Sequence, residues 1–377
     1  ESWDIDTEDD FNLAQAILKQ SQASNLSLDN SNLGNPVVKI NQNLFDLLNQ
    51  ELKSEIDQFL LSKNDKYRVM ISAPYMMKDI ETFKQFYQSL GLDVIVADVK
   101  ERLSEVDLMK YNGKYDIVLA GDDSFTKRIL TESGVRAICK WGTGIDSFDQ
   151  MSAKNLGIPI YNTENAFTVP VAQSIVGAIL NHIRNLHSST ILMRNSDQWV
   201  KIPGKTLEEC TVGIIGFGNI GSQVAKYLTP FEPKILAYDI SSETTVDQYD
   251  NVKSVNLDTL LANSDIICTC CTLGPSSYHI LDQDAFKKMK RGVYIVNMAR
   301  GKLIHQDSLI KSLQNGLVSG AALDVFEDEP LPKESLLRKM DNVMLAAHNS
   351  NSSQKYWNLV HLNTIRNSLK AMNTYTF

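Results

Sequence analysis

The stretch TVGIIGFGNIGSQVAKYLTPFEPKILAYD, from Thr211 to Asp239, decides the fold that this sequence predicts. It begins with a short apolar strand, continues through a glycine turn, and opens a helix near Asn219. A second strand follows over residues 235–238 and ends in an acid. Strand, glycine turn, helix and strand in this order are typical of a βαβ unit in a parallel sheet.

The glycines and the terminal acid of this stretch predict a dinucleotide site. Gly216 permits a tight turn, and Gly218 lets the backbone approach a pyrophosphate at the helix N-terminus. Gly221 lets the helix and the strand pack closely. Asp239, eighteen residues after Gly221, is placed to accept hydrogen bonds from an adenosine ribose. An acid here repels a 2′-phosphate and no arginine follows it, so the sequence favours NAD over NADP.

The totals describe an ordinary globular protein that can hold two domains. The chain has 377 residues, of which 43% are hydrophobic and 22% charged. A net charge of −8 argues against a nucleic-acid or anionic membrane surface. The five cysteines show no paired spacing, which favours a reducing compartment and gives no metal site. With no apolar segment of about 18 residues, we expect a cytoplasmic protein without membrane or nucleic-acid partners.

From residue 67 onward, apolar stretches alternate with amphipathic ones. Five strands are predicted, in YRVMISA (67–73), LDVIVAD (92–98), YDIVLAG (115–121), VRAICKWG (135–142) and IPIYNT (158–163). The alternation predicts a parallel sheet with helices on both faces and ligands at the carboxyl ends of its strands. The loop KWGTGIDSFD after the fourth strand is therefore a candidate binding loop. Gly142 and Gly144 would leave backbone N–H groups unobstructed for a carboxylate, although a plain tight turn is the alternative.

The remaining elements complete a second sheet. Four more strands are predicted after the glycine turn, in IICTCCT (266–272), VYIVNM (293–298), GAALDV (320–325) and VMLAA (343–347). With the two strands of the opening stretch they make six, the number in a full dinucleotide-binding sheet. Apolar periodicity also predicts one helix over 44–61 and one long helix over 168–194, which would lead from the first domain to the second.

Three polar residues, Arg300, Glu329 and His348, fall just past the carboxyl ends of strands in this second sheet. Arg300 offers a planar fork that grips a carboxylate at two points. His348 can exchange a proton near neutral pH, and Glu329 can orient its imidazole. Each alone has a plain alternative, as a surface ion pair, a solvated loop acid or a strand-end residue. Together at the ends of one dinucleotide sheet, they favour hydride transfer from a hydroxy acid.

Five motifs resemble the D-isomer-specific 2-hydroxyacid dehydrogenases, in particular their phosphoglycerate dehydrogenase branch. They are GFGNIG with Asp239, NMARG (297–301), ALDVFEDEP (322–330), His348 in AAHNSNSS (346–353) and KWGTGID (140–146). They lie between about 67 and 372, which is most of the chain. The resemblance implies an NAD-dependent oxidoreductase that interconverts a D-2-hydroxy acid and its 2-keto acid, commonly a homodimer through the nucleotide domain.

The resemblance also implies roles for individual residues. Arg300 would clamp the substrate, His348 would be the acid/base, and Glu329 would support it. Asp324 would contact the nicotinamide carboxamide. The cofactor-binding residues implied are Thr143, Gly216, Gly218, Asn219, Ile220, Asp239, Thr272, Met298, Ala299 and Asp324. The substrate-binding residues implied are Lys140, Gly142, Thr143, Gly144 and Arg300.

The implied fold class is α/β, with two doubly wound parallel-sheet domains. A flavodoxin-like substrate domain would cover 67–168 and 351–377, and a Rossmann NAD-binding domain would be inserted over 169–350. Residues 1–66 would form an N-terminal extension and linker.

The sequence departs from the family pattern near the substrate. Asn349 and Ser350 follow the histidine, where the family has an apolar residue and then Gly or Ala. Lys140 stands where phosphoglycerate enzymes often carry an arginine. An anion site here would keep its positive charge but lose the planar fork of a guanidinium. Asp122 and Asp123 occupy a loop that tends to be basic in that branch. Because acids repel a phosphate, they weaken the phosphoglycerate assignment.

The N-terminus raises an alternative. Residues 3–20 resemble the C-terminal end of CMP-sugar-acid synthetases, which are cytidylyltransferases, with Asp4 and Asp6 at its metal-binding acids. An acidic helix start is the other interpretation of these residues, and residues 21–44 have the composition of a linker. The chain could thus be the dehydrogenase half of a bifunctional enzyme in surface polysaccharide synthesis. A non-catalytic NAD(H)-binding module is the remaining alternative.

Overall fold

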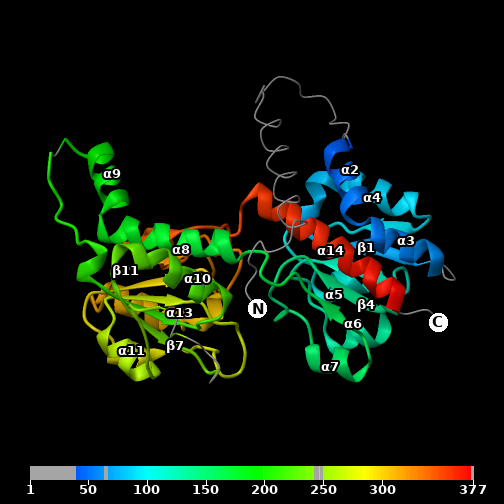
Figure 1. The fold of residues 1–377 in the computed structure, drawn as a ribbon. Coiled ribbons are helices and arrows are strands. Elements are labelled where there is room, and N and C mark those ends of the chain that lie inside the picture. The colour runs from blue at the N-terminus through cyan, green and yellow to red at the C-terminus, as the bar shows by residue number, and fades with distance from the viewer. Residues whose placement is uncertain (1–39, 63–66, 198, 242–245, 247–248, 375–377) are drawn as a thin grey trace. The chain divides into compact units, whose positions relative to one another are not determined.

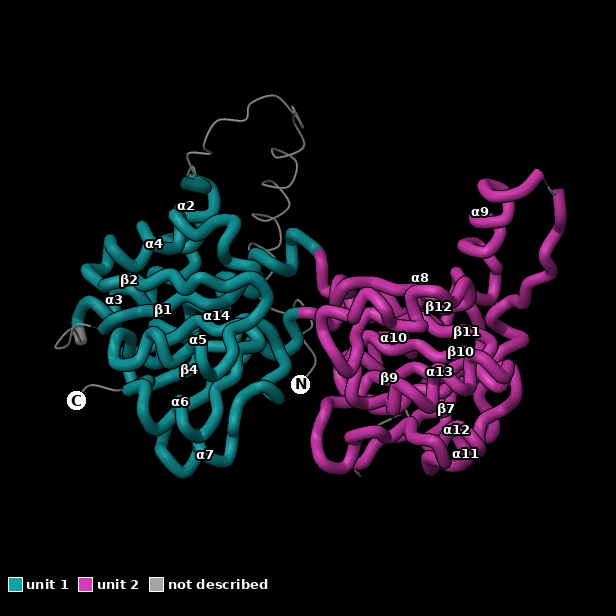
Figure 2. Tube along the Cα trace, turned by 180° about the vertical axis from the view of Figure 1, so that it is seen from behind, with its two compact units in different colours: residues 1–166, 353–377 teal, residues 167–352 magenta. Residues whose placement is uncertain are grey.

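The computed structural model describes the chain except for residues 1–39, 63–66, 198, 242–245, 247–248 and 375–377. The predictions for residues 3–20, and most of the predicted linker, lie outside the described residues. The chain divides into two compact units, which Figure 2 shows in different colours. Unit 1 contains residues up to 166 and residues 353–377, and unit 2 contains residues 167–352.

Unit 1 contains a five-stranded parallel sheet in the order β2-β1-β3-β4-β5. Each strand falls inside one of the predicted segments, so the predicted parallel sheet is confirmed: β1 Arg68–Ile71, β2 Asp93–Val96, β3 Ile117–Ala120, β4 Ala137–Lys140 and β5 Ile160–Tyr161. The connecting helices are η1 Pro74–Asp79, α4 Ile80–Ser89, α5 Glu105–Met109, α6 Lys127–Glu132 and α7 Gln150–Asn155. The order reverses direction between β1 and β3, and ligands bind at such a switch point in open α/β sheets.

Three further helices belong to unit 1: α2 Gln42–Glu51, α3 Lys53–Ser62 and α14 Gln354–Thr374. The prediction of one helix over 44–61 is wrong, because the chain leaves the helical conformation at Leu52. Leu52 is fully buried, so the bend keeps its side chain in the core. The C-terminal helix α14 packs on β3, β4 and α3 (Figure 1). Arg366 on α14 pairs with Glu55 of α3 at 3.0 Å.

Unit 2 contains a seven-stranded parallel sheet in the order β12-β11-β10-β9-β6-β7-β8. The strands are β6 Thr211–Ile215, β7 Lys234–Tyr238, β8 Val252–Ser254, β9 Ile266–Thr269, β10 Val293–Asn297, β11 Val318–Leu323 and β12 Val343–Leu345. Six of them lie where the sequence predicts, and the prediction missed β8. This strand has three residues, and both of its last two are exposed, so it has no apolar pattern to detect.

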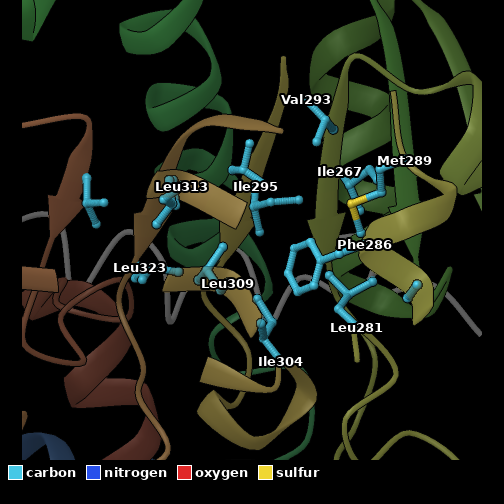
Figure 3. Close-up of a cluster of buried hydrophobic side chains, with 14 of the residues drawn as sticks. Ile267, Leu281, Phe286, Met289, Val293, Ile295, Ile304, Leu309, Leu313 and Leu323 are labelled. Carbon is cyan, nitrogen blue, oxygen red and sulfur yellow. The ribbon is translucent and has the colours of Figure 1, made fainter. Parts of the chain in front are cut away.

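The helices of unit 2 connect these strands: α8 Thr168–Ile183, α9 Leu186–Asn195, η2 Leu207–Glu209, α10 Asn219–Leu228, η3 Thr229–Phe231, α11 Leu257–Asn263, α12 Gln283–Lys288, η4 Gly301–Leu303, α13 Gln306–Gln314 and η5 Leu336–Lys339. Figure 3 shows the core that strands and helices share, in which Ile267, Ile295 and Leu323 face Phe286 and Leu309. Burying one such side chain contributes roughly 1.5–3 kcal/mol. The central strands β9 and β10 are buried along their whole length, so both of their faces are covered, as in parallel sheets generally.

The predicted long helix over 168–194 is two helices. Asn185, between α8 and α9, takes a left-handed conformation with φ of 53°, which ends α8. Asparagine tolerates this region better than most residues, and the Asn185 side-chain amide donates to the carbonyl of Pro203 at 2.9 Å. As a result α9 stands away from the sheet of unit 2 (Figure 1), and none of its residues is buried.

Across the part of the chain that is described, no helix is both long and apolar enough to cross a membrane.

Candidate functional site

The glycine turn of unit 2 has the geometry that a pyrophosphate needs. Gly216 takes φ of +92°, and a Cβ there would strike the backbone of Cys271. A Cβ on Gly221 would strike the carbonyl oxygen of Gly216, so α10 can approach β6 only with glycine at 221. Gly218 differs, because nothing lies within 4 Å of the position of its Cβ. Neither packing nor left-handed backbone explains this glycine, whereas a group bound at the N-terminus of α10 does.

The carboxylate of Asp239 holds the end of β7 against this turn. One oxygen accepts from the Phe217 N–H at 2.6 Å, and the other accepts from the Ser241 N–H at 2.8 Å. The side chain is only half-buried, and a carboxylate has about four acceptor sites. Asp239 can therefore accept further hydrogen bonds from a ribose. Asn219 and Ile220, also predicted to bind the cofactor, form the first turn of α10.

Asn297 fixes the loop that carries Arg300. Its Oδ1 accepts from the Thr269 hydroxyl at 2.8 Å and from the Ala299 N–H at 3.1 Å. Its Nδ2 donates to the carbonyl of Arg300 at 2.9 Å. The side chain is 1% exposed, so this network is rigid. Asn297 is not among the predicted site residues, although a polar residue that ends a wholly apolar strand is a usable signal.

His348 and Glu329 are brought into contact by two loops of unit 2. The imidazole Nδ1 lies 3.1 Å from Oε2 of Glu329, and Oε1 of Glu329 accepts from the Phe326 N–H at 3.0 Å. Burial raises the pKa of Glu329, but hydrogen bonding to His348 and the charges of His348 and Arg300 outweigh it and lower that pKa below its ordinary value. Glu329 is therefore ionised at neutral pH. Arg300, Glu329 and His348 thus share one electrostatic environment.

Asp324 folds the loop that presents His348. Its carboxylate accepts from the N–H of Asn349 at 2.6 Å and from the N–H of Ser350 at 2.8 Å. Its backbone carbonyl accepts from the N–H of His348 at 2.8 Å. His348 itself has a φ of 50°, an uncommon conformation for this residue type. Asp324 is 1% exposed, which leaves almost none of its surface for the nicotinamide carboxamide that the sequence analysis assigned to it.

Three predicted cofactor residues follow other strands of the same sheet. Thr272 comes shortly after β9, and its carbonyl accepts from the Ser277 hydroxyl at 2.6 Å. Met298 and Ala299 come directly after β10; Met298 is 7% exposed and Ala299 is half-buried. Because all strands of this sheet are parallel, these loops share its carboxyl edge with the glycine turn and with His348.

The predicted substrate residues 140–144 lie in unit 1, at the end of β4 and in the loop that follows it. The prediction that the Gly142 N–H is unobstructed is wrong, because it donates to Oγ1 of Thr163 at 3.2 Å. The Thr143 hydroxyl donates to the carbonyl of Thr163 at 3.1 Å, and the Thr143 carbonyl accepts from Asn162 at 2.8 Å. Lys140 is buried and pairs with Asp122 at 3.0 Å. The loop after β4 is thus held by the loop after β5.

The residues of unit 2 therefore fit a bound dinucleotide on their own geometry. The turn has a positive φ at Gly216, an open position at Gly218 and a half-buried acid at Asp239. The same carboxyl edge of the sheet carries an imidazole, a carboxylate that is ionised at neutral pH and an arginine. This set can bind a carboxylate and transfer a proton at one edge of the sheet. Within the described residues, no cluster of three or more His, Cys, Asp or Glu could hold a metal ion.

Known proteins resemble the chain in sequence. The family model of the NAD-binding domain of the D-isomer specific 2-hydroxyacid dehydrogenases matches residues 176–350. A glyoxylate reductase from Thermofilum pendens is 38% identical over 221 residues, which cover 57% of this chain and 65% of that enzyme. A hydroxypyruvate reductase from Thermotoga maritima is 35% identical over 291 residues, which cover 75% of this chain and 91% of that enzyme.

Solved structures resemble the chain in fold. A D-lactate dehydrogenase from Aquifex aeolicus, complexed with NAD and lactic acid, has a TM-score of 0.69 and 26% identity, covering 80% of this chain and 93% of that one. An NAD-dependent formate dehydrogenase from Staphylococcus aureus, in complex with NAD, has a TM-score of 0.71 at 24% identity, covering 80% and 94%. Neither alternative from the sequence, the bifunctional enzyme or the non-catalytic module, is favoured by relatives with these names.

Proposed function

This chain belongs to the D-isomer specific 2-hydroxyacid dehydrogenase family, and we propose that its Arg300, Glu329 and His348 carry out the NAD-dependent interconversion of a D-2-hydroxy acid and its 2-keto acid. The observation that carries this proposal is the 3.1 Å contact between Nδ1 of His348 and Oε2 of Glu329. An imidazole held by an ionised carboxylate is the arrangement that general acid/base catalysis requires.

His348 moves the hydroxyl proton of the substrate. Because Nδ1 faces the carboxylate of Glu329, the proton on Nδ1 is held there and Nε2 is the nitrogen that exchanges. In reduction of the keto acid, Nε2–H gives its proton to the substrate oxygen as C2 receives a hydride. The negative charge of Glu329 stabilises the imidazolium form that donates. Asp324 keeps the ring in place through the loop amides at 349 and 350.

Arg300 holds the substrate carboxylate. Its guanidinium is planar and always charged, so it can bind both carboxylate oxygens and fix the orientation of C2. The loop network of Asn297 positions its backbone, with the carbonyl of Arg300 bound by Nδ2 of Asn297. The same charge favours the ionised form of Glu329. Arg300 would thus support both binding and the acid/base pair.

The nucleotide turn would hold NAD, which supplies or accepts the hydride when bound. The N–H groups at the start of α10 and the open position at Gly218 suit the pyrophosphate. Asp239 suits the adenosine ribose. Thr272, Met298 and Ala299 are the candidates for the ribose and the nicotinamide on this sheet edge. In unit 1, Lys140, Gly142, Thr143 and Gly144 remain candidates for ligand contacts.

The assay for this proposal is oxidation of NADH in the presence of glyoxylate, hydroxypyruvate or pyruvate. We expect Arg300→Ala to lower kcat/KM by about 10²- to 10⁴-fold, since it removes two charge-assisted hydrogen bonds worth roughly 1.5–3 kcal/mol each. NADH affinity, measured by fluorescence, should change less than about threefold. Arg300→Lys should recover part of the loss, because it restores the charge without the fork.

Lys302→Ala is the matched control, because it removes a positive charge from an exposed side chain two residues away. We expect this variant to keep the wild-type kcat/KM. Arg300→Ala with near wild-type activity, or with an equal loss of NADH affinity, would contradict the substrate-clamping role.

We also propose that the chain forms a homodimer through unit 2. Among the described residues, the segment from α9 to residue 202 exposes large apolar side chains: Leu186 (56% exposed), Met193 (52%), Trp199 (85%), Val200 (56%) and Ile202 (37%). A second copy presents the same apolar segment, and a two-fold dimer buries the same patch on both subunits. Met193→Glu should therefore shift the mass measured by light scattering toward the monomer.

We also propose that the protein is cytoplasmic. All five cysteines lie within the described residues and all are free thiols. Free thiols are typical of a reducing environment, which supports a cytoplasmic location.

A further inference from the structure

The backbone before Glu329 places its carboxylate. The Phe326 N–H donates to Oε1 of Glu329 at 3.0 Å, so the position of this acid depends on the segment at 326–327. That segment lies directly on Gly301, because a Cβ at 301 would strike the carbonyl group of Phe326. Glu329 and the loop of Arg300 therefore both depend on how the segment at 326–327 is held.

Glu327 fixes this segment to two neighbouring loops of unit 2. Its Oε1 accepts from the N–H of Gln306, the first residue of α13, at 3.2 Å. A carboxylate at the N-terminus of a helix is favourable. The same oxygen lies 2.8 Å from Nε2 of His279, in the loop after β9. The side chain of Glu327 thus joins three loops at the carboxyl edge of the sheet, two residues before the acid that contacts His348.

His279 supplies the other half of this contact. Its Nε2 is enclosed by protein, and it lies within hydrogen-bonding distance of Glu327 without the alignment of a regular hydrogen bond. Within the described residues, this nitrogen has no other hydrogen-bond partner. An enclosed polar atom without a partner costs free energy, so the nearby carboxylate is what compensates for the burial of this nitrogen.

The surroundings of His279 hold its ring in place. The ring stacks on Tyr278 with centroids 4.0 Å apart, and it makes a T-shaped contact with His305 at 4.9 Å. The His279 N–H donates to the carbonyl of Lys302 at 2.9 Å. The φ of His279 is 50°, an uncommon value that His348 shares. Such a conformation persists only where the surroundings impose it, and it is found preferentially at functional sites.

We propose that the His279–Glu327 pair positions Glu329 for the acid/base step. The contacts run from His279 to Glu327, through the Phe326 N–H to Glu329, and from Glu329 to His348. All of these residues belong to unit 2. His279 and Glu327 are positioning residues, since they act on the proton of the substrate only through Glu329 and His348. This inference rests on the proposed function, because it concerns the same acid/base pair.

The pair should govern kcat rather than KM. Arg300 would bind the substrate carboxylate, and Asn297 fixes its loop. The hydrogen bond from the His279 N–H to Lys302 uses only backbone atoms, so a side-chain substitution leaves it in place. A displaced Glu329, in contrast, would misplace the imidazole it contacts. Small displacements of a catalytic group lower the rate of the chemical step strongly.

The test is steady-state reduction of glyoxylate, hydroxypyruvate or pyruvate by NADH. We expect His279→Leu and Glu327→Ala each to lower kcat by about 5- to 50-fold. The KM for the keto acid and the affinity for NADH should change less than about threefold. His279→Gln should recover most of the loss, because its amide N–H can reach Glu327 from nearly the position of Nε2. Asp328→Ala is the matched control, since it removes an exposed acid from the same loop, and it should keep the wild-type kcat.

A double-substitution cycle tests whether the pair acts through Glu329. Glu329→Ala removes the side chain that the pair positions, so adding His279→Leu to it should lower kcat by less than about a further twofold. A further loss as large as that in the wild-type background would overturn the inference, and so would a wild-type kcat in His279→Leu. Urea unfolding shows which variants are folded. If His279→Leu is not, Glu327→Ala takes its place in the same cycle.

Failure of the proposed function gives a different result, which is that the wild type reduces none of these keto acids. The pair is then judged by the imidazole of His348, whose proton NMR signals are followed against pH and identified by their loss in His348→Asn. The charge of Glu329 stabilises the imidazolium form. The titration midpoint in His279→Leu should therefore move from the wild-type value toward that in Glu329→Ala. An unchanged midpoint would overturn the inference.

Discussion

Asp239 and Asp324 make a close comparison within unit 2. Both follow a strand of the same parallel sheet, β7 and β11, and both accept two backbone N–H groups on their carboxylate oxygens. They differ in burial, since Asp239 is half-buried and Asp324 is 1% exposed. Both acids are predicted from the sequence to bind the cofactor. In the structure, the carboxylate of Asp239 is still accessible to a ligand, whereas that of Asp324 is buried and hydrogen-bonded to its own loop.

This difference in burial gives the two acids different capacities to bind a ligand. A half-buried carboxylate keeps acceptor sites for a ribose, so Asp239 is suited to recognition. Burying a carboxylate is costly unless hydrogen-bond donors surround it. The N–H groups of Asn349 and Ser350 donate these hydrogen bonds to Asp324. We therefore expect Asp324 to act on the chemistry through the conformation of His348. Substituting each acid separately tests this division.

We expect the largest effect from Asp324→Asn. The new amide nitrogen cannot accept, so one buried N–H of the loop loses its partner, which costs about 1–3 kcal/mol of unfolding free energy. Because this loop holds His348, kcat should fall by about 10- to 100-fold at saturating NADH. Urea unfolding and steady-state kinetics measure the two effects.

Asp341→Asn is the control for this variant, because it changes an exposed acid just before β12. It should alter neither stability nor kcat. If Asp324→Asn raised only the KM for NADH and left kcat unchanged, Asp324 would belong with Asp239 as a cofactor contact.

Asp239→Ala should have a smaller and different effect. It removes hydrogen bonds between a charged group and the ribose, so we expect NADH affinity to fall about tenfold or more. NADPH affinity should fall less or rise, since the negative charge that repels a 2′-phosphate is gone. The value of kcat at saturating cofactor should stay close to that of the wild type. A fluorescence titration that shows the same preference for NADH would contradict the assignment.

The charge of Glu329 has the smallest expected effect on stability. Its pKa lies below the ordinary value of 4.5 in the folded protein, so its ionisation stabilises the fold above pH 4.5 and the benefit is lost as the pH falls further. The side chain is 35% exposed, so the benefit is below about 1 kcal/mol. Glu329→Gln should thus be slightly less stable than the wild type at pH 7, and the difference should shrink as the pH falls below 4.5. A stability difference that grew on acidification would show the opposite sign.

The fold could be predicted largely because parallel strands are apolar on both faces. The segments at 293–298 and 320–325 are recognisable as continuous apolar runs, and both form core strands. Where the structure departs from the predictions, the cause is local. Asn185 breaks a continuous apolar stripe through its left-handed backbone, and Leu52 bends a helix while its side chain stays buried. Apolar periodicity continues across both breaks, so it cannot locate them.

The candidate site could be predicted in part. Polar residues after apolar strands identified Glu329 and His348, whose side chains lie 3.1 Å apart. Sequence could not tell that Asp324 is buried, because an acid after a strand looks the same in either environment. The contact between the rings of Tyr75 and Trp357, whose centroids lie 5.5 Å apart, also escaped prediction. Tyr75 and Trp357 are 282 positions apart in the chain and meet only through the sheet and α14.

The open position at Gly218 determines how a substitution there would affect the cell. Its φ of −79° is open to any residue, and no atom occupies the place of its Cβ. An alanine there would fit the empty chain, so we expect the variant to fold and to escape the proteases and chaperones that remove unstable proteins. Its methyl group would instead hinder a pyrophosphate bound at the start of α10. Such a lesion would accumulate at full abundance in the cell and reveal itself as a missing metabolic flux.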